Sequence, residues 1–93
     1  MTVLVLSRRL ETLTGSLFEL RRLGYSPLGT LDPAEAVEIA ELRELDVFVV
    51  GDDIEGEEAT ETIAGVLSAR PACRLVRADG PEWIVDQVVR TGV

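Results

Sequence analysis

Residues 46–50 read DVFVV, and the polar sequence Gly51-Asp52-Asp53 follows them directly. An apolar run of this kind, bounded by polar residues, is typical of a strand buried on both faces of a parallel sheet. Residues 3–6, VLVL, form a second such run near the N-terminus. Two doubly buried strands in a chain of 93 residues favour a small α/β domain with helices on both faces of the sheet.

Strand and helix patterns alternate around these two runs. Apolar residues recur at helical spacing over residues 10–23 until Gly24, although weak helix formers in the first half also allow a start near Thr14. Residues 26–30 form a short strand. Pro27 places it at a sheet edge, because proline cannot donate a hydrogen bond to a neighbouring strand.

The second half of the chain continues the alternation. Residues 32–35, DPAE, predict an N-cap and a capping box for a helix that continues to about Glu44. A third helix is expected over about 57–69, a fourth strand over 73–78 and a last helix over about 82–90.

These elements form four strand–helix units, which predict one domain over residues 1–93. Right-handed crossovers between parallel strands then give a three-layer, doubly wound α/β/α sandwich whose four-stranded parallel sheet has the order 2-1-3-4. In such folds, ligands collect where the strand order reverses, at the carboxyl ends of the first and third strands. Those ends carry the candidate site residues, Ser7-Arg8-Arg9 and Gly51-Asp52-Asp53.

Acidic residues are concentrated in the middle of the chain. The net charge is −8, and residues 32–61 hold twelve acids against one base, Arg43, for a net charge of −11. A negatively charged surface excludes free nucleic acid as a partner, because phosphate binding requires a net basic face. The acidic block is either a solvated helix face or a docking surface for a basic partner, such as an arginine-bearing face of a second copy.

The composition also predicts the compartment. No apolar run approaches the roughly 20 residues that span a bilayer, and the N-terminal run lacks the basic residues and cleavage site of a signal peptide. Cys73 is the one cysteine, so no internal disulfide can form. We therefore expect a cytoplasmic protein with no membrane partner.

From residue 3 to residue 51, the spacing resembles the receiver domain of response regulators without a gap. VLVL is followed by two residues, at the positions where the family has its acid pair, and then by an amphipathic helix that ends in Leu-Gly-Tyr at residues 23–25. The segment Glu35-Ala36-Val37-Glu38 is similar to the family's acidic second helix, and residues 46–50 are similar to its third strand. The resemblance implies a signalling domain with a flavodoxin-like fold.

The positions that carry the family's chemistry differ in this chain. The resemblance implies an acid pair after the first strand to hold Mg²⁺ and an aspartate after the third to accept a phosphoryl group. Ser7 and Arg8 fill the acid-pair slot, and Gly51 fills the acceptor slot. Arg77-Ala78-Asp79 stands where a switch hydroxyl is expected, and the chain has no lysine to pair with phosphate. We expect a module for protein contact, with no enzyme activity and no cofactor.

Two other functions of the candidate site stay open. Arg8 and Arg9, together with free amide groups at a helix start, could hold an anion or a nucleotide phosphate near Gly51. Alternatively, a one-residue shift would make Asp52 a phosphoryl acceptor, with Mg²⁺ held by neighbouring acids. We favour a structural interpretation in which Arg8 pairs with Asp52 or Asp53 and closes a vestigial pocket.

The last part of the chain predicts self-association. A fourth strand at the sheet edge invites pairing unless it is blunted. Arg74 and Arg77 either blunt that edge or meet the acidic block of a second copy. Trp83 lies off the apolar face of the last predicted helix, beside Gln87 and Arg90, so it either anchors an interface or folds over the preceding turn. We expect a homodimer that uses these residues.

Overall fold

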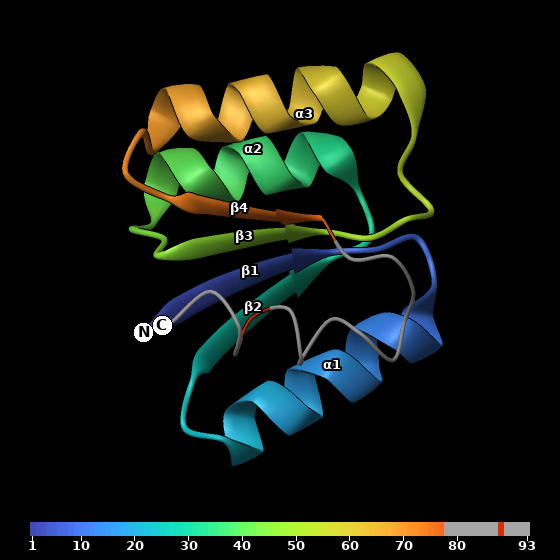
Figure 1. The fold of residues 1–93 in the computed structure, drawn as a ribbon, viewed down its shortest axis with the longest axis vertical. Coiled ribbons are helices and arrows are strands. Elements are labelled where there is room, and N and C mark those ends of the chain that lie inside the picture. Colours follow the sequence, from blue (N-terminus) through green and yellow to red (C-terminus); the bar gives the residue numbers. More distant parts are fainter. Residues whose placement is uncertain (78–87, 89–93) are drawn as a thin grey trace.

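The computed structural model describes residues 1–77 and residue 88, which form a four-stranded parallel sheet and three helices (Figure 1). The strands are β1 (Thr2–Leu6), β2 (Ser26–Thr30), β3 (Val47–Val50) and β4 (Arg74–Arg77). The helices are α1 (Leu10–Arg22), α2 (Pro33–Leu42) and α3 (Gly56–Ala69). The strand order is β2-β1-β3-β4, which confirms the predicted topology.

The sheet separates two helical layers. α1 covers one face, whereas α2 and α3 lie side by side over the other (Figure 1). Because successive side chains of a strand point to opposite faces, each strand contributes to both halves of the core. Leu4 and Phe48 pack toward α2 and α3, whereas Val5 and Val49 pack toward α1 in a cluster that includes Val88. The predicted three-layer sandwich is thereby confirmed.

β1 fixes the position of the candidate site, because it pairs with β2 on one side and with β3 on the other. Its last residue, Leu6, lies opposite Thr30 of β2 and Val50 of β3, so the three strands end at the same level. Beyond these ends, the Gly51 amide donates to the Leu6 carbonyl at 2.9 Å, and the Ser7 amide donates to the Thr30 carbonyl at 3.2 Å.

The start of α2 confirms the predicted N-cap and corrects its detail. The Asp32 carboxylate accepts a hydrogen bond from the Ala34 amide at 3.0 Å, and Pro33 opens the helix. The Asp32 amide donates to the Thr30 hydroxyl at 3.1 Å. That hydroxyl therefore takes the place of the Glu35 carboxylate in the expected capping box.

Some element boundaries differ from those predicted. α1 begins at Leu10, so the late start near Thr14 does not occur. α2 ends at Leu42 instead of about Glu44, because Arg43 is extended. The side chain of Arg70, after α3, donates to the carbonyl of Arg43 at 2.8 Å and so caps the end of α2.

The fourth strand begins one residue later than expected. β4 covers Arg74–Arg77 within the predicted 73–78, of which residue 78 lies outside the described residues. The predicted helix over 82–90 also lies outside them, except for Val88, which is helical and buried. In residues 1–77 and 88, no helix has the length and apolar character needed to cross a membrane.

Two glycines provide a matched test of how closely α1 packs on β2. A Cβ added at Gly29 would lie 2.8 Å from methyl carbons of both Leu13 and Leu17, whereas a Cβ at Gly15 would meet no atom within 4 Å. We predict that Gly29→Ala lowers the free energy of unfolding by about 1–3 kcal/mol through overpacking. Gly15→Ala should raise it by about 0.5–1 kcal/mol through helix propensity. Urea unfolding measures both, and equal effects would contradict the close packing.

Candidate functional site

The candidate site lies at the carboxyl ends of β1 and β3, where Ser7 and Gly51 follow neighbouring strands. A Cβ added at Gly51 would lie 2.7 Å from Oδ1 of Asp53 and 3.3 Å from the carbonyl oxygen of Leu6. Glycine is therefore needed here because the Asp53 carboxylate folds back beside the strand end. The side chain that the receiver resemblance expects at residue 51 would compete with Asp53 for this space.

Hydrogen bonds hold Asp53 in this position. Its Oδ2 atom accepts from the hydroxyl of Ser7 at 2.9 Å and from the backbone amide of Arg8 at 3.0 Å. The same Ser7 hydroxyl accepts from the amide of Arg9 at 3.2 Å. Because Ser7 is buried, its hydroxyl needs these partners. One carboxylate thus joins the loop after β3 to the segment that leads into α1.

The other carboxylate oxygen is not satisfied in the same way. Oδ1 of Asp53 is buried, and no group in residues 1–77 or 88 forms a hydrogen bond with it. An unsatisfied buried acceptor costs about 1–3 kcal/mol. The two hydrogen bonds to Oδ2 offset that cost.

The side chain of Arg8 forms an ion pair, although not with the predicted partner. Its guanidinium forms an ion pair with the carboxylate of Glu58, in the first turn of α3. The prediction that this side chain pairs with Asp52 or Asp53 is wrong, because Asp53 turns inward to the Arg8 amide and Asp52 is exposed. The hydrogen bond with Glu58, followed by the charge of that carboxylate, raises the pKa of Arg8.

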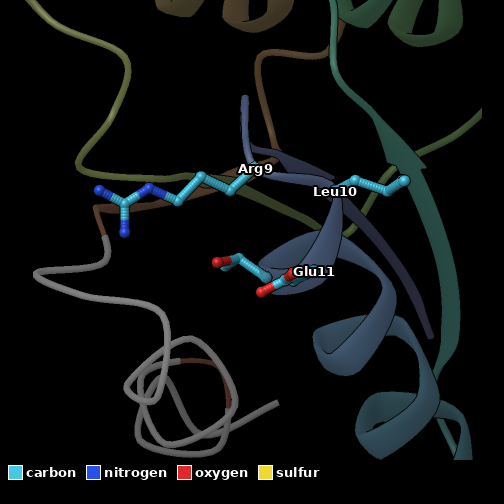
Figure 2. Close-up of a pocket in the computed structure, with 4 residues that line it drawn as sticks. Arg9, Leu10 and Glu11 are labelled. Carbon is cyan, nitrogen blue, oxygen red and sulfur yellow. The ribbon is translucent and has the colours of Figure 1, made fainter.

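Arg9 lies at the N-cap of α1. Arg9, Leu10, Glu11 and Thr12 line a pocket at the start of α1 (Figure 2). Figure 2 shows the side chains of Arg9 and Leu10 directed to opposite sides of the helix start. Because Arg8 is paired with Glu58 of α3, an anion that used both arginines would have to compete with that carboxylate, and the joint anion site stays a prediction.

The acidic loop after β3 does not gather its carboxylates. In residues 1–77 and 88, no three His, Cys, Asp or Glu side chains are close enough together to hold a metal ion. Asp52 is exposed in the turn, whereas Asp53 points back toward β1. These two neighbouring acids therefore have separate surroundings.

The residues predicted to form a self-association surface are only partly described. Arg74 and Arg77 lie at the two ends of the edge strand β4, and Arg77 donates to the carbonyl of Ile54 at 3.3 Å. This bond attaches β4 to the loop after β3. Trp83, Gln87 and Arg90 lie outside the described residues.

We predict that Gly51 and Asp53 are energetically coupled. Gly51→Ala should lower the free energy of unfolding by about 1–3 kcal/mol, because the new methyl group meets the Asp53 carboxylate. In an Asp53→Ala background the same change should cost at least about 1 kcal/mol less, since the nearest obstructing atom is gone. Chemical denaturation of both single variants and the double variant measures this coupling. Additive effects would show that Asp53 does not occupy the space beside Gly51.

The thiol of Cys73, which is buried as expected, provides a pH test. Burial, with a smaller contribution from the charge of Asp46, raises the pKa of this thiol from 9.0 to about 11. The folded protein therefore holds the thiol proton more tightly than the unfolded chain does. The resulting stabilisation is complete below pH 9.0 and is lost as the pH rises to about 11. In urea unfolding across this range, Cys73→Ala should show a shallower decline than the wild type, and identical slopes would contradict the shift.

Comparisons with known proteins identify the fold and no family. No protein-family model matches the chain, and no curated protein matches it. Among solved structures, it is similar to the solution structure of a de novo designed Rossmann 2x3 fold protein, with a TM-score of 0.69 and 21% sequence identity. The match covers 96% of this chain and 86% of the designed one. The chain therefore has a Rossmann-like, doubly wound α/β fold.

Proposed function

We propose that this chain is a receiver-like regulatory domain that does not transfer phosphoryl groups and acts through contact with another protein. The observation that carries the proposal is the position of Asp53. Its carboxylate occupies the space beside Gly51 and is held there by the Ser7 hydroxyl and the Arg8 amide. The place where a receiver would present its acceptor is thus filled from within the chain.

The charges around this place support the same proposal. A phosphoryl group entering a receiver site needs a divalent cation to neutralise its charge. Here the guanidinium of Arg8, two residues after β1, is already compensated by the carboxylate of Glu58. An incoming anion would have to compete with Glu58, whereas an incoming cation would meet a like charge at Arg8.

The alternative function, phosphoryl transfer, would use the exposed Asp52 as the acceptor. Asp52 is accessible, but its neighbour Asp53 contributes its carboxylate to the interior and does not face the same solvent-filled space. A phosphoryl group on Asp52 would therefore lack the paired acids that coordinate Mg²⁺ in the receiver mechanism. This arrangement favours a surface that binds protein over a reaction centre.

Thermal unfolding with Mg²⁺ and beryllofluoride, a phosphoryl mimic, tests the proposal directly. Ligands that bind the folded state raise the melting temperature. We expect no shift for the wild type, for Asp52→Asn or for Asp53→Asn. Mass spectrometry after incubation with acetyl phosphate and Mg²⁺ should likewise show no phosphorylated species.

Two outcomes would contradict the proposal and identify its replacement. A magnesium-dependent rise that disappears in Asp52→Asn would establish a phosphoryl acceptor at that residue. A rise caused by a nucleotide, abolished in Arg8→Ala and retained in the matched variant Arg43→Ala, would establish an anion-binding domain.

A further inference from the structure

The outward face of α1 carries large apolar side chains. Leu10 is 64% exposed and Phe18 is 65% exposed. They are eight residues apart and therefore about 12 Å apart along the helix axis. Thr14 lies midway between them, and its hydroxyl is already bonded to the Leu10 carbonyl at 2.7 Å. The stripe from Leu10 to Phe18 therefore presents mostly apolar surface, while Leu13 and Leu20 on the neighbouring face bury against the sheet.

A hollow adjoins the Leu10 end of this stripe. Figure 2 shows Leu10 directed toward β2, away from Arg9. Leu31, just after β2, is 41% exposed, and its side chain adds a second apolar wall. The residues that line the hollow are Leu10, Leu13, Gly29, Thr30, Leu31, Asp32 and Glu35. Its interior is thus largely apolar, and two carboxylates stand at its α2 side.

The other end of the stripe carries the opposite charge. Arg21 and Arg22 follow Phe18 by about one turn, and both are exposed. Arg22 continues the row of Leu10, Thr14 and Phe18 but already pairs with Glu19, whereas Arg21 stands on the side of this row that faces the start of β2. One surface therefore offers an aromatic side chain next to an arginine and, about 12 Å away, an apolar hollow next to two acids.

We infer that two copies of the chain associate through antiparallel packing of their α1 helices about a two-fold axis at Thr14. Phe18 of each copy then lies over the hollow beside Leu10 of the other, and Arg21 faces the Asp32 and Glu35 carboxylates. The contact is self-complementary in shape and charge, as a closed dimer requires. The inference rests on the protein-contact part of the proposed function and names the partner as a second copy.

Sedimentation equilibrium of the full chain tests this dimer. The wild type should show a concentration-dependent monomer–dimer equilibrium. Phe18→Asp should raise the dimer dissociation constant at least about tenfold, because it places a charge in the apolar hollow. Leu42→Asp is the matched control, since Leu42 is an exposed leucine on α2, away from this surface. Circular dichroism confirms that both variants remain folded.

A charge exchange tests the orientation. Arg21→Glu and Glu35→Arg should each weaken the dimer, and the double variant should recover wild-type association because the pair is restored with reversed signs.

A wild type that is monomeric at every concentration would overturn the inference, as would equal effects of Phe18→Asp and Leu42→Asp. Loss of association in Leu75→Asp on the β4 edge, with Phe18→Asp unaffected, would overturn it in favour of that edge. None of these results alters the beryllofluoride test, so failure of the dimer and failure of the non-catalytic assignment are distinguishable.

Discussion

The parallel pairing of β1 with β3 is the constraint on which the candidate site depends. β1 is hydrogen-bonded to β2 and β3 and buried on both faces, so its end cannot shift relative to theirs. The strand order reverses at this pair, and the connections after β1 and β3 therefore lead to opposite faces of the sheet. Residues that follow the two strands are brought together even though they are more than forty positions apart in the chain.

The chain uses this junction to connect its layers. Asp53 joins the start of α1 to the loop after β3, and Arg8 reaches across to Glu58 of α3. The ion pair is half-exposed, so its contribution to stability is small. Of the two hydrogen bonds to Asp53, the one from the Ser7 hydroxyl is partly buried and counts for more, whereas the one from the Arg8 amide is exposed. The site is therefore held chiefly by a carboxylate that accepts from the chain's own backbone and hydroxyl groups.

The scaffold could be predicted because its signals are local and strong. The apolar runs VLVL and VFVV indicate strands buried on both faces, and Asp32-Pro33 indicates a helix start. The sequence predicts where the candidate site lies, but it does not predict which of its side chains contact one another. Asp52 and Asp53 are identical in chemistry, and the turn after β3 alone decides that the second points inward. Glu58 could have been suggested by its place in the first turn of α3, but its distance from Arg8 depends on how that helix packs.

Amide-proton exchange at Arg8 tests most directly whether the junction is closed by the chain itself. This amide lies outside the strands and helices, and the Asp53 carboxylate is its hydrogen-bond partner. Nuclear magnetic resonance should show slow exchange at Arg8 in the wild type and much faster exchange in Asp53→Ala, with the interior of β1 protected in both. Fast exchange at Arg8 in the wild type would mean that Asp53 leaves the junction open and that a ligand could enter it.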